Sequence, residues 1–108
     1  MAAEDSVARA YTGQGMTIAH RRWRGQGGEI DLIVRDGEKV IFVEVKKSRS
    51  HNQAATRVLP SQIARIQASG EEFLGSEPNG LLTEARFDVA LVDAMGRTEI
   101  IENALMMA

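Results

Sequence analysis

The sequence predicts an α/β domain in which a mixed β-sheet is flanked by helices. Apolar residues recur at helical spacing near the start of the chain and again after residue 60. Strand-like runs rich in β-branched residues lie between these two helices, and two further runs follow the second helix. The expected order is therefore αβββαββ. The 108 residues suffice for one small domain, and we expect residues 1–108 to form it.

Local patterns define the expected elements. Residues 3–13 are predicted to be helical, because Val7 and Tyr11 lie on one face at helical spacing. Glycines at the end of this segment are expected to terminate the helix. Residues 60–74 are predicted to be helical for the same reason, with a proline in the first turn. The predicted strands cover residues 16–24, 29–35, 40–46, 86–93 and 98–101. Residues 47–59 are polar without clear periodicity, and we expect them to form a mobile loop.

Composition excludes several classes of protein. The chain is 44% apolar and 26% charged, which is close to the average of globular domains and unlike disordered or fibrous chains. It has no cysteine, so disulfides and zinc–thiolate sites are excluded. No apolar stretch approaches the length of a membrane span, and the first residues are acidic where a signal peptide is basic. We therefore expect a cytoplasmic protein with no membrane partner.

The charge is unevenly distributed although the net charge is only −2. Residues 20–65 hold ten Lys or Arg against five Asp or Glu, and residues 66–108 hold two against eight. A basic middle segment is suited to binding the phosphate backbone of a nucleic acid. The alternative is that these charged residues are simply solvated and their uneven distribution has no function. The basic strand also contains Trp23, which suits base stacking or, alternatively, burial in the core.

The predicted hairpin over residues 29–46 contains the candidate catalytic residues. Side chains alternate along a strand, so Glu44 and Lys46 share a face. A four-residue loop from Asp36 to Lys39 places Asp31 on that face directly opposite Glu44, and a two-residue Asp36–Gly37 loop places it there diagonally. The other face is expected to be apolar, with Ile30, Leu32, Val34, Ile41, Val43 and Val45. Two opposed carboxylates repel unless a cation lies between them, and Mg²⁺ suits carboxylate oxygens. The alternative is a surface ion pair with Lys46.

Two strings of this hairpin resemble a known pattern. Gly28-Glu29-Ile30-Asp31-Leu32-Ile33 followed by Val43-Glu44-Val45-Lys46 resembles the active-site pattern of the PD-(D/E)XK nuclease superfamily. More narrowly, nearly the whole chain resembles the YraN family, small bacterial proteins related to archaeal Holliday-junction resolvases. The resemblance implies a single nuclease-like domain with a restriction-endonuclease-like fold. It also implies an endonuclease that hydrolyses phosphodiester bonds in DNA, branched DNA included, with Mg²⁺ or Mn²⁺.

The resemblance implies roles for single residues. Asp31 and Glu44 would hold the metal, and Glu4 on the first helix would complete the site. Lys46 would position the attacking water or steady the developing charge. Apart from the resemblance, the basic strand and the polar loop make Arg21, Arg22, Arg24, Lys47 and Arg49 the expected nucleic-acid contacts, together with Arg65 of the second helix.

Two other functions stay open on the sequence alone. One is a nucleic-acid-binding module of the same fold that does not cleave. The other is a protein-interaction domain, which the acidic end of the chain favours. The terminal Leu105-Met106-Met107 would be either a packed tail or the contact of a homodimer.

Overall fold

The computed structural model describes residues 3–47 and 60–104. The predicted loop, from residue 48 on, therefore lies outside the described residues, as do Arg49 and the terminal Leu105-Met106-Met107. The described elements are α1 (Ala3–Thr12), β1 (Thr17–Gly25), β2 (Gly28–Asp36), β3 (Lys39–Lys47), α3 (Pro60–Leu74), the short 3-10 helix η1 (Gly80–Leu82), β4 (Ala85–Val92) and β5 (Thr98–Ile101). Every predicted helix and strand is present within one residue of its expected bounds, whereas η1 was not predicted.

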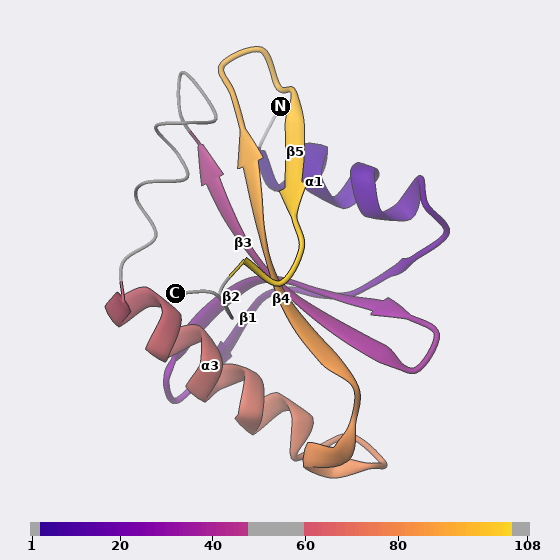
Figure 1. Cartoon of the computed structure of the whole chain (residues 1–108), viewed down its shortest axis with the longest axis vertical. Coiled ribbons are helices and arrows are strands. Elements are labelled where there is room, and N and C mark those ends of the chain that lie inside the picture. The colour runs from indigo at the N-terminus through magenta and orange to yellow at the C-terminus, as the bar shows by residue number, and fades with distance from the viewer. Residues whose placement is uncertain (1–2, 48–59, 105–108) are drawn as a thin grey trace.

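The five strands form one mixed sheet in the order β1-β2-β3-β4-β5. Neighbouring strands are antiparallel except β3 and β4, which are parallel. Parallel neighbours need a crossover connection, and α3 lies in the connection from β3 to β4. Figure 1 shows α1 and α3 on opposite sides of the strands. The molecule is thus the α/β arrangement that the sequence predicts. In the part of the chain that the structure describes, no helix combines the length and apolar character needed to cross a membrane.

Both faces of the sheet are buried, because side chains of the central strands alternate between the two helices. The face beneath α1 packs Val7, Ala8, Tyr11, Leu32, Val34, Ile41, Val43, Ala90 and Val92. The face beneath α3 packs two clusters, which contain Ile30, Ile33, Val40, Phe42, Phe73 and Leu74, and Ile63, Ile66, Val89 and Leu91. A charged side chain on the central strands is therefore placed against apolar surroundings.

The alternation along β2 breaks at Asp31. Ile30 was predicted on the same face as Leu32, but Leu32 packs beneath α1 and Ile30 packs in the α3 cluster. On the neighbouring strand, Arg22 lies between the residues paired with Leu32 and Ile30 and has a positive φ of 52°. Asp31 thus lies where the alternation of β2 changes, next to this irregular residue of β1.

Candidate functional site

Asp31 and Glu44 lie at the end of the β2–β3 hairpin. The ladder between the two strands ends at the pair Leu32 and Val43, in the register that would set Asp31 opposite Glu44. Asp31 lies one residue beyond this pair, and its Oδ2 accepts a hydrogen bond from the backbone N–H of Val45 at 2.8 Å. The carboxylate therefore takes the place of a backbone carbonyl at the end of the ladder, which holds it beside the strand that carries Glu44.

Glu44 is a buried carboxyl in an unfavourable setting for its charge. Its residue is only 7% exposed. Burial first, and then the hydrogen bond and the repulsion from Asp31, raise the pKa of the Glu44 carboxyl to about 8. The positive charges of Lys46 and Arg65 oppose this rise. The register and the Val45 hydrogen bond bring Asp31 beside Glu44, and the burial of Glu44 means that this pair is not a fully solvated surface ion pair.

Arg65 of α3 contacts this carboxyl directly. Its Nη2 lies 3.2 Å from Glu44 Oε2. The aliphatic part of the side chain lies on Gly28, where a Cβ would stand 2.3 Å from Arg65 Cδ and where φ is +132°. Ser69, one helical turn along, donates to the Gly28 carbonyl at 2.8 Å. Within residues 3–47 and 60–104, Arg65 Nε is a buried nitrogen with no hydrogen-bond partner.

Glu4 lies near Asp31 but is held by an arginine. Its Oε1 is 3.2 Å from Arg22 Nε. Glu4, Arg22, Asp31 and Lys47 line a hollow of about 200 Å³. In the described part of the chain, no three histidine or acidic side chains come close enough together to share a metal ion. In these described residues Glu4, Asp31 and Glu44 thus do not form one three-carboxylate cluster, and two of them, Glu4 and Glu44, pair with Arg22 and Arg65.

The Asp31–Glu44 pair nevertheless suits a divalent cation. Carboxylate oxygens are the ligands that Mg²⁺ prefers, and Mg²⁺ commonly takes one or two protein carboxylates and keeps several waters. A cation between the two carboxyls would remove the repulsion that contributes to the raised pKa of Glu44. These two residues could therefore hold the metal, and the role of Glu4 stays a prediction.

The basic residues of β1 differ in their surroundings. Arg21 Nη1 lies 2.7 Å from Asp5 Oδ1 of α1, so Arg21, like Arg22, pairs with the first helix. Arg24 is exposed. Trp23 is half-buried and packs edge-on against Phe73 of α3, with ring centroids 5.4 Å apart, at the margin of the α3 cluster.

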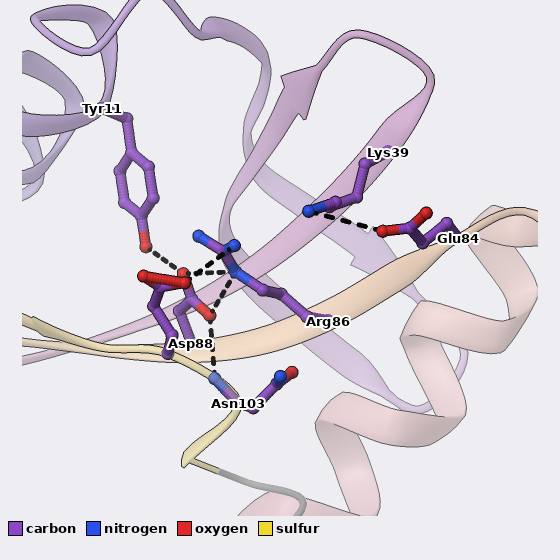
Figure 2. Close-up of polar contacts among 7 residues, drawn as sticks. Tyr11, Lys39, Glu84, Arg86, Asp88 and Asn103 are labelled. Carbon is purple, nitrogen blue, oxygen red and sulfur yellow. Dashed lines mark hydrogen bonds and ion pairs between the residues drawn. The ribbon is translucent and has the colours of Figure 1, made fainter.

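A buried polar network on the α1 side of the sheet was not predicted (Figure 2). Asp88 of β4 is fully buried and accepts a hydrogen bond from the Tyr11 hydroxyl at 2.7 Å. Arg86 Nε and the Asn103 backbone N–H also donate to Asp88, at 3.0 and 3.1 Å. Arg86 pairs in turn with Glu102 at 2.9 Å. Burial first, then Asp88, raises the pKa of Tyr11 far above its usual value. The only sequence signal was an acidic residue inside an apolar strand.

Comparison with known proteins gives one consistent result. The model of "Uncharacterised protein family UPF0102" matches residues 3–92. A UPF0102 protein of Cereibacter sphaeroides is 61% identical over 102 residues, which cover 94% of this chain and 87% of that protein. A UPF0102 protein of Roseobacter denitrificans is 57% identical, with 97% of this chain and 81% of that protein covered. One of Ruegeria pomeroyi is 55% identical, with coverage of 95% and 84%.

Proposed function

The chain belongs to the uncharacterised protein family UPF0102, and we propose that it is a nuclease that hydrolyses phosphodiester bonds in DNA with Mg²⁺ or Mn²⁺. The observation that carries this proposal is the pair of converging carboxyls, Asp31 and Glu44, at the end of a hairpin. One of them is 7% exposed and is destabilised as an anion by the other. A buried acidic pair of this kind is costly to keep without a cation.

The surroundings of the pair support this chemistry. A bound Mg²⁺ would polarise a phosphate oxygen and lower the pKa of a coordinated water. Asp31 and Glu44 would hold it, with Asp31 oriented by the Val45 N–H. Lys46 lies close enough to Glu44 to lower its pKa. From there its ammonium group would orient the attacking water or stabilise charge that develops on the phosphate.

The fold supports the same proposal at a coarser level. A helix, an antiparallel three-stranded unit, a crossover helix and a parallel fourth strand follow one another in the described chain. We propose that this arrangement is the restriction-endonuclease-like fold that the sequence resembles. The acidic pair would then lie on the second and third strands of the sheet, which is where the resemblance puts it.

A second function is favoured by a specific observation. Two of the three predicted metal ligands, Glu4 and Glu44, pair with Arg22 and Arg65. A site whose acids are neutralised by the chain's own arginines could bind nucleic acid without cleaving it. The two functions make the same prediction for binding and opposite predictions for metal-dependent hydrolysis.

A cleavage assay tests the proposal. The purified protein is incubated with linear and four-way branched DNA in Mg²⁺, Mn²⁺ or EDTA. We expect metal-dependent products that Glu44→Gln abolishes and that Lys46→Ala reduces by about 10²-fold. Lys39→Ala is the matched control, because Lys39 lies at the other end of β3 and pairs with Glu84. DNA binding without cleavage in either metal would favour the second function, and cleavage that survives Glu44→Gln would contradict the assigned site.

A further inference from the structure

We propose that Arg65 holds Glu44 in the metal-free protein and exchanges this carboxylate for a phosphate of the nucleic acid when a divalent cation binds. Arg65 would then oppose metal binding and favour nucleic-acid binding. The inference rests on the proposed function, since it needs a cation at the Asp31–Glu44 pair. It adds a competition between a residue of the chain and the metal for one carboxylate.

The first observation is that the contact between Arg65 and Glu44 is incomplete. A guanidinium commonly binds a carboxylate through two parallel hydrogen bonds. Among residues 3–47 and 60–104, one bond is formed, from Nη2 to Oε2 at 3.2 Å, while the neighbouring Nε is buried without a partner. A buried donor without a partner costs free energy. Arg65 therefore gives up a single hydrogen bond when it leaves Glu44 for an acceptor that meets both of its Nη groups.

The second observation concerns the two ends of this ion pair. The Glu44 side chain is 8% exposed, whereas the Arg65 side chain is 40% exposed. The carboxylate is fixed on a central strand, and the guanidinium has solvent on one side into which it can move. A cation that binds Glu44 would stand close to the permanently charged guanidinium, and the two positive charges would repel. The mobile partner is therefore the one that leaves.

The third observation limits how far Arg65 can move. Its stem lies on Gly28, at a position where any larger residue would collide with it. The backbone there is anchored to α3 by the Ser69 hydrogen bond. A guanidinium released from Glu44 consequently stays beside the acidic pair. A phosphate held by the metal presents two oxygens at that place, which matches the two-point geometry of an arginine.

Metal affinity provides the test, with Mn²⁺ as the probe and calorimetry of the full chain as the readout. Arg65→Gln should bind Mn²⁺ about 3- to 10-fold more tightly than the wild type, because a competing charge is removed. Arg65→Lys keeps the charge and should stay within about twofold of the wild type. In Ca²⁺, Arg65→Gln should also bind duplex DNA more weakly, with a salt slope lower by about one unit. Lys39→Gln is the control for net charge.

The outcomes separate this inference from the proposed function. If the wild type binds Mn²⁺ and Arg65→Gln binds it equally or more weakly, the exchange is refuted and the metal site stands. The same holds if Arg65→Lys tightens binding as much as Arg65→Gln, since that would indicate packing rather than charge. If neither the wild type nor Arg65→Gln binds Mn²⁺, the metal site and the exchange both fail. Circular dichroism of each variant confirms that it is folded.

Discussion

The protonation of the Glu44 carboxyl makes the stability of the protein depend on pH. A carboxyl whose pKa is raised on folding binds more protons in the native state than in the unfolded state. Stability is therefore greatest below the unfolded pKa, falls as the pH rises from about 4.5, and reaches its lower level above about 8. This direction is the reverse of that for an ordinary salt-bridged acid.

Asp31→Asn should make the metal-free protein more stable at neutral and alkaline pH. The variant removes the charge that repels Glu44, and its amide oxygen can still accept the Val45 N–H. We expect a gain of about 0.5–2 kcal/mol in the free energy of unfolding, and a smaller decline in stability between pH 5 and pH 8.

Thermal melts in EDTA and in millimolar Mg²⁺ measure both effects of this substitution. Mg²⁺ should raise the melting temperature of the wild type and should raise that of Asp31→Asn far less. A simple ion pair with Lys46 predicts the opposite signs, with a destabilised variant and no response to Mg²⁺. That result would contradict the metal site.

At the scale of elements, the polar network joins three separate parts of the fold. Tyr11 extends from α1, Asp88 and Arg86 belong to β4, and Asn103 follows β5 (Figure 2). A fully buried carboxylate is tolerated because each of its oxygens accepts hydrogen bonds. The network therefore holds the first helix, which carries Glu4, against the sheet.

Tyr11→Phe should destabilise the protein by about 1–3 kcal/mol, because it leaves the buried Asp88 with one donor fewer and creates no cavity. Urea denaturation measures the change, with the slope of the transition expected to stay constant. Thr12→Ala is a neighbouring control whose hydroxyl makes only a long 3.4 Å contact within its own exposed helical turn. A loss below about 0.5 kcal/mol for Tyr11→Phe would mean that Arg86 and Asn103 alone satisfy Asp88.

The elements could be predicted, because the helical stripe and the strand alternation are local patterns. The hairpin register could be predicted only as far as a shared face for Asp31 and Glu44, and the pairing of Asp36 with Lys39 selects the directly opposed arrangement. The break in alternation at Asp31 could not be predicted, because the local pattern gives Ile30 and Leu32 the same face, whereas they pack on opposite sides of the sheet.

The long-range part of the candidate site could not be predicted for a related reason. The contact between Arg65 and Glu44 forms only once the crossover folds α3 onto the sheet. The bond between Tyr11 and Asp88 spans 77 residues along the chain. Neither pair has a spacing that a local pattern reveals. The two acidic members of these pairs, Glu44 and Asp88, share one sequence signal, because each is a charged residue within an apolar strand.

At the scale of the whole molecule, several cations of the basic middle are paired within the chain, at or near its surface. Cations of the basic middle pair with acids from other parts of the chain, in Arg21–Asp5, Arg22–Glu4, Arg35–Glu77 and Lys39–Glu84. The basic segment is therefore less available to a polyanion than its net charge indicates. Arg24 and Lys47 are exposed, and they remain suited to phosphate contacts.

Replacing Arg21, Arg22 and Arg24 together by Ala should weaken DNA binding and make it less sensitive to salt. Loss of the Arg24 contact alone lowers the slope of log affinity against log salt by about one unit, and loss of all three lowers it by roughly 2–3 units where the DNA draws Arg21 and Arg22 away from Asp5 and Glu4. Fluorescence anisotropy across a series of salt concentrations measures this slope, with Lys39→Ala as the control. An unchanged slope would place the binding surface away from β1, on the side of Arg65.

The two faces of the sheet each hold one optical reporter. The chain has a single tryptophan and a single tyrosine. Trp23 packs against Phe73 of α3, and Tyr11 packs in the cluster beneath α1. Tryptophan emission thus reports on the layer that carries Arg65, and tyrosine ultraviolet absorbance reports on the layer that carries Asp88. A disturbance confined to one layer can be located without introducing any label.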